Sequence, residues 1–214
     1  MITIKSFVFN PIQVNTYILY DETKECIIID AGVLYKNEEE QLKKFISENE
    51  LIPIKLLNTH YHFDHILGNK FVFENYNVSI EAHSSLKEIL KKIDIIKIAS
   101  MFGLIIDNPP QITKYLDDGN IIKFGNSELS VFHVPGHAPE SIVFYNEEQK
   151  FAIVGDVLFD GSIGRTDLPG GNYNTLINSI KEKLLVLNDD VKIYPGHGNT
   201  TTIGRERKYN PFFK

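Results

Sequence analysis

The chain has 214 residues, of which 43% are hydrophobic and 23% charged, and its net charge at pH 7 is -6. A chain of this length suits one domain of the larger α/β kind and can bury a sizeable core on folding. The acidic balance argues against a basic surface built to bind nucleic acid. We therefore expect a single domain over residues 1–214, with no nucleic-acid partner.

The sequence also favours a cytoplasmic protein. Cys26 is the only cysteine, so no disulfide can form within the chain, and its apolar neighbours place it in the core. The first residues lack the basic and then apolar pattern of a signal peptide. The longest apolar segment, residues 93–106, contains Asp94 and Lys97 and is too short to span a bilayer. We expect no membrane partner, and the oligomeric state is left open.

Hydrophobic periodicity predicts strands that alternate with helices. In chain order, strands are expected near residues 2–4, 14–20, 26–29, 54–57, 78–80, 121–124, 129–134, 142–145, 151–154 and 191–194. Amphipathic helices are expected at residues 38–50, 86–96 and 173–187, and a continuation of the second past residues 101–102 is left open. Residues 69–77 are expected to be a short helix or loop. The helix at 86–96 is expected to pack into the core or to form a wall or lid of a substrate cleft.

The most unusual stretch follows the predicted strand at residues 54–57. Three histidines and an aspartate, His60, His62, Asp64 and His65, fall within six residues. Residues two apart in an extended chain share a face, so His60 and His62 leave the strand pointing the same way. Asp64 and His65 follow where the chain must turn, and they can serve a second position nearby. Clusters of this kind are typical of metal sites rather than of solvated loops.

Three further residues with ligand chemistry each follow an apolar strand directly: His137, Asp156 and His197. Functional side chains gather on loops that a rigid scaffold holds at strand ends. The seven residues suffice for two ions, so we assign them to two groups: His60, His62 and His137 in one, and Asp64, His65 and His197 in the other. Asp156 is expected to bridge the ions, because a carboxylate has two oxygens and a charge that offsets two cations.

These motifs, in this order, resemble the metallo-β-lactamase fold superfamily. The resemblance is carried by His60-Tyr61-His62-Phe63-Asp64-His65, Pro135-Gly136-His137, Gly155-Asp156 and Pro195-Gly196-His197-Gly198. It covers nearly the whole chain and implies an α/β fold, an αββα four-layer sandwich of two mixed β-sheets flanked by helices. It also implies metals at one edge of the sandwich, and the bridging role of Asp156 rests partly on it.

Within the superfamily, residues 161–171 and 201–212 resemble the short bacterial glyoxalase II-like hydrolases, the hydroxyacylglutathione hydrolase type. Classical glyoxalase II carries an added C-terminal helical domain that helps to hold glutathione. The sequence stops at Lys214, so we expect no such domain here, and the resemblance leaves glutathione specificity open.

Four other residues near these motifs have open roles. Asp30, at the end of the third predicted strand, is either a turn former or a support for the site. His83 is isolated and is expected just past a strand, in a structural or surface position. His133 lies inside a predicted strand, which favours a structural or ligand-supporting role over an eighth ligand. Arg165 either pairs with Asp167 or meets an anionic substrate.

The chemistry that these residues predict is metal-assisted hydrolysis. Two ions can lower the pKa of a shared water from about 15.7 toward 7, which makes hydroxide available. Asp64 would orient that hydroxide for attack on a carbonyl. A thiolate, with a pKa of about 8.5, leaves without a strong general acid, whereas an amide nitrogen needs a proton donor. The prediction is therefore a thioesterase of the S-lactoylglutathione-cleaving type with two divalent ions, zinc or else iron or manganese.

Two other functions are weighed against this one. The stretch from Gly164 to Asp167 also resembles persulfide dioxygenases, which are mononuclear iron oxidoreductases of the same fold. His197 argues against that alternative, because it supplies a ligand that a one-iron enzyme does not need. A binding module with structural metals is disfavoured, because structural zinc sites are usually rich in cysteine and no cysteine lies among these residues.

Overall fold

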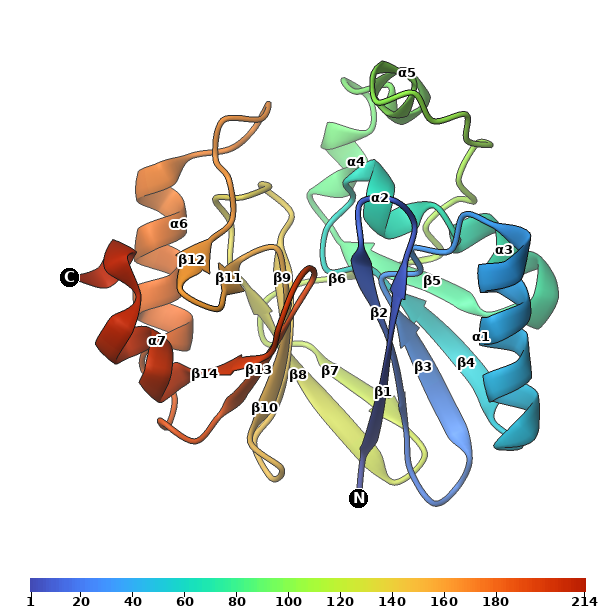
Figure 1. Ribbon diagram of the computed structural model, residues 1–214, viewed down its shortest axis with the longest axis horizontal. Helices are drawn as coiled ribbons and strands as arrows, with labels where there is room; N and C mark the ends of the chain where they lie inside the picture. Colours follow the sequence, from blue (N-terminus) through green and yellow to red (C-terminus); the bar gives the residue numbers. More distant parts are fainter.

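Two mixed β-sheets face each other in the centre of the molecule, and helices cover the outer side of each sheet (Figure 1). This computed structural model describes residues 1–214. The six-stranded first sheet has the order β1-β2-β3-β4-β5-β6, and the six-stranded second sheet has the order β14-β13-β10-β9-β8-β7. The predicted four-layer αββα sandwich is therefore confirmed.

The first sheet and the helices beside it come from the first half of the chain. Its strands are β1 (Thr3–Phe9), β2 (Val14–Tyr20), β3 (Glu25–Ile29), β4 (Ile52–Leu57), β5 (Ser79–His83) and β6 (Lys114–Leu116). The helices are α1 (Lys36–Glu48), α2 (Phe63–Ile66), α3 (Asn69–Tyr76), α4 (Leu86–Ile89) and α5 (Ile95–Met101). In Figure 1, α1 and α3 lie on the outer face of this sheet, and α2, α4 and α5 lie above its upper end.

The second sheet comes from the second half. Its strands are β7 (Ile121–Phe124), β8 (Ser127–His133), β9 (Ile142–Asn146), β10 (Phe151–Gly155), β13 (Lys192–Pro195) and β14 (Thr201–Thr202). A small hairpin, β11 (Leu158–Phe159) and β12 (Ser162–Ile163), lies beside it. The helical segments are α6 (Tyr173–Ser179), a π-helical turn (Ile180–Leu184), α7 (Ile203–Tyr209) and a 3₁₀ turn (Pro211–Phe213). Of these, α6 and α7 cover its outer face (Figure 1).

The apolar core follows the layers. One cluster, which includes Leu19, Ile29 and Phe144, fills the space between the two sheets. A second cluster joins the second sheet to α6 and α7, and a third joins the first sheet to α1 and α3. Cys26 is fully buried in the third cluster, as its apolar neighbours predict. None of the helices combines the length and the apolar character needed to cross a membrane.

Strand direction brings the polar strand ends to one edge. Strands β3, β4 and β5 run parallel, so Asp30, the segment after Leu57 and His83 emerge on the same side. In the second sheet, β10 is parallel to β13 and antiparallel to β9, which is itself antiparallel to β8. The carboxyl ends of β8, β10 and β13 therefore share an edge as well, and they deliver the loops that carry His137, Asp156 and His197.

Several predicted elements differ from the structure. The helix expected at residues 86–96 is two short helices, α4 and α5, because the Asp94 side chain accepts a hydrogen bond from the Lys97 N–H and starts a new helix there. His83 is the last residue of β5 rather than a residue beyond it. The helix expected to reach residue 187 changes to π-helical geometry at Ile180 and ends at Leu184. Strand β6 was not predicted.

Candidate metal centre

The seven residues predicted as ligands come together at the shared edge of the two sheets. Five of them, His60, His62, Asp64, His65 and His137, come from the loop after β4, from α2 and from the loop after β8. Of the other two, Asp156 directly follows β10, and His197 lies two residues after the end of β13. Their side chains are buried or half-buried, and that of His197 is the most open, at 23% exposure.

Three histidine nitrogens converge to form the first group. Nε2 of His137 lies 3.3 Å from Nε2 of His60 and 3.0 Å from Nδ1 of His62. Two nitrogens bound to one tetrahedral zinc at about 2.0–2.1 Å lie roughly 3.3 Å apart, so the spacing fits a shared ion. The lone pairs of neutral imidazole nitrogens repel one another when no N–H group lies between them. A cation bound among the nitrogens removes that repulsion. These are the three residues assigned to one ion from the sequence, and they form one of the groups able to hold a metal.

Asp64, His65 and His197 form a second such group. Nε2 of His197 lies 3.3 Å from Oδ2 of Asp64, and Nε2 of His65 lies 3.6 Å from the same oxygen. Asp156 lies between the groups: its Oδ1 is 3.4 Å from His65 Nε2, and its Oδ2 is 3.5 Å from His197 Nε2 and 3.8 Å from His137 Nε2. This position suits the predicted bridge.

Two atoms of the cluster indicate that it is built for cations. His65 Nε2 and Asp156 Oδ1 are buried and have no hydrogen-bond partner in the protein. Burying a polar atom without a partner costs free energy, so such atoms call for an explanation. Imidazole nitrogens and carboxylate oxygens are donors that divalent zinc, iron and manganese accept. The residues therefore fit two divalent ions, and the role of each as a ligand stays a prediction.

The electrostatics differ between the two groups. Burial and then the neighbouring His137 lower the pKa of His62 to about 4, so its ring is neutral and ready to bind a cation. Burial also favours neutral His65, but the carboxylates of Asp156 and Asp64 outweigh it and raise the pKa of His65 well above its ordinary value. Burial alone would raise the pKa of Asp156, yet His65 outweighs it and holds that pKa far below the usual range.

Backbone carbonyls and a carboxylate orient the histidine rings. Nδ1 of His137 lies 2.8 Å from the carbonyl oxygen of Arg165, and Nδ1 of His197 lies 3.1 Å from the carbonyl oxygens of Ile12 and Gln13 in the β1–β2 turn. Nδ1 of His65 lies 3.0 Å from Oδ2 of Asp30. A proton held at Nδ1 by such a partner leaves Nε2 free as a ligand.

Asp30 therefore supports the site, and it also has the backbone geometry of a turn residue. Its φ is +52°, and its side chain is buried. Besides His65, it accepts hydrogen bonds from the Thr59 N–H at 2.8 Å and the Thr59 hydroxyl at 2.6 Å. The oxygen of that hydroxyl lies 3.1 Å from Nδ1 of His60. One carboxylate thus steadies a histidine of each group.

Gly196 allows the close approach of the last loop. A Cβ at this position would overlap the Asp156 carboxylate and the His65 ring. Its backbone carbonyl accepts the Asn15 N–H at 2.7 Å, and the Asn15 side chain donates to the carbonyls of Pro195 and Gly198. The first sheet therefore fixes the loop that carries His197.

The remaining sequence candidates lie outside the cluster. His133 is the last residue of β8 rather than a residue inside it, so that part of the prediction is wrong. Its ring stacks on buried His83, with ring centroids 4.0 Å apart. The Arg165 side chain forms two hydrogen bonds of 2.7 Å with Asp167, the ion pair that was one of its two predicted roles. Its contact with a substrate stays a prediction. Sequence reasoning missed Thr59 and Glu140, which carry no motif of their own.

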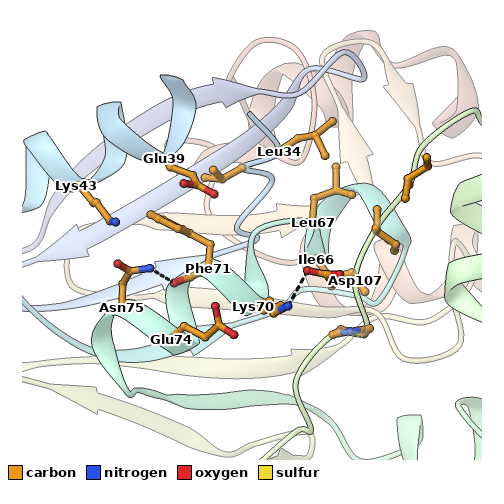
Figure 2. Close-up of a pocket in the computed structure, with 14 residues that line it drawn as sticks. Leu34, Glu39, Lys43, Ile66, Leu67, Lys70, Phe71, Glu74, Asn75 and Asp107 are labelled. Atoms are coloured by element: carbon orange, nitrogen blue, oxygen red, sulfur yellow. Dashed lines mark hydrogen bonds and ion pairs between the residues drawn. The ribbon is translucent and has the colours of Figure 1, made fainter. Parts of the chain in front are cut away.

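Two hollows lie on the surface near these elements. The larger, about 420 Å³, lies between α1, α3 and the 105–109 segment, with Phe71 and Leu67 on its walls (Figure 2). None of the seven predicted ligands lines it, so the chemistry does not lie there. A hollow of about 330 Å³ opens beside His197 and gives this residue access to solvent.

Comparisons with known proteins identify the family. A profile of the Metallo-beta-lactamase superfamily matches residues 9–197, which is most of the chain. The chain belongs to the metallo-beta-lactamase superfamily. This is a superfamily of metallo-hydrolases, so the comparison supports an enzyme, and it confirms the resemblance carried by the sequence motifs.

Relatives within the superfamily cover the whole fold. Hydroxyacylglutathione hydrolase GloC of Haemophilus influenzae is 40% identical over 94% of this chain and 92% of its own. The crystal structure of BLEG-1 B3 metallo-beta-lactamase is 35% identical, with a TM-score of 0.90 over 99% of this chain and 100% of its own. TTHA1623 in a di-iron-bound form is 33% identical, with a TM-score of 0.85 over 97% and 99%. Members of the superfamily bind divalent metals, and which metal this chain binds is a separate question.

Proposed function

We propose that this chain is a metal-dependent hydrolase that cleaves a thioester of the S-lactoylglutathione type. The observation that carries the proposal is the meeting of two three-residue ligand groups at Asp156. Two groups with a carboxylate between them match the ligand requirement of a two-ion hydrolytic site. The similarity to a hydroxyacylglutathione hydrolase over nearly the full length adds support for the thioester.

The side chains have separable roles in this reaction. Divalent ions would supply Lewis acidity, which lowers the pKa of a nearby water toward about 7 and polarises a carbonyl. Asp64, with its Oδ2 3.3 Å from His197 Nε2, would accept a hydrogen bond from that water and aim its lone pair at the carbonyl carbon. Asp64 and Asp156 also supply two of the negative charges that offset the cations. His197 lies on the open side, where the substrate would enter.

The leaving group favours a thioester over an amide. A departing thiolate has a pKa of about 8.5 and leaves without protonation, whereas an amine does not. The seven side chains at the centre are expected to act as ligands. Arg165, whose backbone carbonyl contacts His137, has its guanidinium paired with Asp167. A reaction that needs no proton donor therefore suits this site best.

The alternative of a one-iron persulfide dioxygenase rests on the Gly164–Asp167 resemblance. The position of His197 beside Asp64 and Asp156 favours two ions over one. We also propose a small-molecule thioester or ester as the substrate, without a nucleic-acid or membrane partner, and a cytoplasmic location. Zinc is the proposed metal, with iron or manganese as alternatives that the same donors accept.

Metal analysis of the purified protein, combined with turnover of S-lactoylglutathione and a small panel of thioesters, tests the proposal. We expect two ions per chain and thioester hydrolysis that is lost on chelation and restored by the metal. One iron per chain together with oxygen uptake on a persulfide would replace the proposal with the dioxygenase. A fully loaded protein that hydrolyses no thioester would refute it.

A further inference from the structure

Glu140 is a buried carboxyl group next to the metal centre that the proposed reaction does not use. It lies in the loop between β8 and β9, three residues beyond His137, and is 3% exposed. Its Oε1 accepts a hydrogen bond from the Tyr61 N–H at 3.2 Å, while its Oε2 is buried without a partner. An apolar residue would fill this space without that desolvation cost. Packing alone therefore does not explain a carboxyl group at this position.

The hydrogen-bond partner of Glu140, the Tyr61 N–H, lies between two predicted metal ligands. Tyr61 separates His60 from His62, and its own side chain is buried in the apolar cluster beneath α4 and α5. A second hydrogen bond joins the same two segments, because the Ile142 N–H donates to the Thr59 carbonyl at 2.8 Å. The two bonds lie on either side of His60. They tie the loop after β4 in the first sheet to the β8–β9 loop and to the first residue of β9 in the second sheet.

The three-histidine group is assembled across this junction. His60 and His62 belong to the first loop, and His137 belongs to the second. Nε2 of His137 stays 3.3 Å from His60 Nε2 and 3.0 Å from His62 Nδ1 only while the two loops keep their present offset. We propose that Glu140 is a positioning residue for this group, since it holds the Tyr61 N–H and so sets His60 and His62 against His137. The proposal rests on the proposed two-ion site but not on the substrate.

A positioning role differs from a general structural role in what it changes. Loss of a residue that supports a ligand typically weakens metal binding about 10–100-fold. Glu81 offers a matched comparison, because it is a buried glutamate of β5 that contacts Ser79 and Lys114 and none of the seven ligands. If Glu140 only stabilised the fold, its replacement and that of Glu81 would lower the unfolding temperature alike and leave ion affinity unchanged.

The experiment titrates Co²⁺ into metal-free wild type, Glu140→Leu, Glu140→Gln and Glu81→Leu and follows the cobalt absorption bands. Each variant is also made with His197→Ala, which leaves only the three-histidine group intact. The dissociation constant measured in this background is therefore that of the ion at the three-histidine group. We expect Glu140→Leu to weaken this ion roughly 10–100-fold and to alter its spectrum. Glu140→Gln keeps an acceptor for the Tyr61 N–H, so it should stay within about threefold of wild type, as should Glu81→Leu.

Unchanged affinity in Glu140→Leu, or an equal loss in Glu81→Leu, would overturn the inference. Should Glu140→Leu fail to fold, Glu140→Met removes the acceptor with a more adaptable side chain. Unchanged affinity in Glu140→Met, or an equal loss in Glu81→Leu, would then overturn the inference. Because the readout is ion affinity, the result stands apart from whether the protein hydrolyses thioesters. A wild-type protein that binds two ions but cleaves no thioester would refute the proposed function and leave this inference to be judged on the affinities.

Discussion

Replacing Asp30 with asparagine should weaken metal binding, most directly in the group that contains His65. Asp30 accepts hydrogen bonds from the Thr59 N–H and hydroxyl, and its Oδ2 lies 3.0 Å from Nδ1 of His65. In Asp30→Asn, Oδ1 can still accept the Thr59 N–H. An NH₂ group replaces Oδ2, so it no longer accepts the Thr59 hydroxyl that contacts His60, and it faces His65. The ring must then present an acceptor at Nδ1, which moves its proton to Nε2, the atom predicted to bind the metal.

The size of the effect follows from these contacts. A proton on Nε2 has to leave before the ion can bind, and loss of such an orienting partner typically costs about 10–100-fold in metal affinity, or roughly 1.4–2.7 kcal/mol. Asp30→Ala is less informative, because it leaves three buried donors without partners at about 1–3 kcal/mol each. That sum approaches the whole stability of an ordinary domain, about 5–15 kcal/mol.

The assay combines metal titration with histidine ¹⁵N NMR of the metal-free protein. The NMR is recorded above the raised pKa of His65, where its ring is neutral and carries one proton. We expect Asp30→Asn to weaken the ion at Asp64, His65 and His197 by that factor, and to move the His65 proton from Nδ1 to Nε2. Asp21→Asn serves as the control. Asp21 is a buried, hydrogen-bonded turn residue at the end of β2 that lies away from the metal centre. Wild-type affinity for both ions in Asp30→Asn, or an unchanged tautomer, would refute the reasoning.

Three further predictions concern turnover, protons and substrate. His60→Ala should lower thioester turnover at least about 100-fold with little change in the unfolding midpoint, and a folded variant with near wild-type hydrolysis contradicts the mechanism. The raised pKa of His65 keeps its ring protonated near neutral pH, so the ion that binds there must displace a proton and should bind more tightly as pH rises. The pKa of His62 is about 4, so ion binding at the three-histidine group should release few protons. Calorimetry in buffers of different ionisation enthalpy counts these protons, and equal release at both groups contradicts the assignment. The exposed ring of Phe102, at the end of α5, packs at a tilt against Phe63 of α2, which lies between two predicted ligands. Phe102→Ala should therefore raise KM for apolar acyl thioesters roughly fivefold without changing metal content. Ile121→Ala, at an exposed apolar position in β7, is the control and should leave KM unchanged. An equal change of KM in both variants would contradict the hypothesis that α5 lines the substrate cleft.

The sequence predicts those parts of the fold in which local pattern and tertiary packing agree. The β7–β8 hairpin has a glycine-containing turn between two apolar runs, and it forms as expected. The stripe from Leu86 to Ile96 keeps helical spacing, yet a cap at Asp94 divides it, because capping is a short-range signal that periodicity ignores. Strand β6 has only three residues and gains its place by pairing with β5, which no local pattern reveals.

The candidate site divides in the same way. His60, His62, Asp64 and His65 are recognisable because their side-chain types and spacing are unusual in themselves. Glu140 is not, since a lone glutamate after a proline looks like any solvated loop residue until the fold buries it against Tyr61. Supporting residues are chosen by contacts between distant segments, so the ligands can be predicted from the sequence while much of their support cannot.

The central claim is that seven residues at one edge of the sandwich hold two ions with Asp156 between them. Anomalous diffraction from crystals grown with the bound metal tests it most directly. The account predicts two anomalous peaks about 3.5–4 Å apart, one beside His60, His62 and His137 and one beside Asp64, His65 and His197, with Asp156 contacting both. A single peak, or peaks away from this cluster, would contradict it.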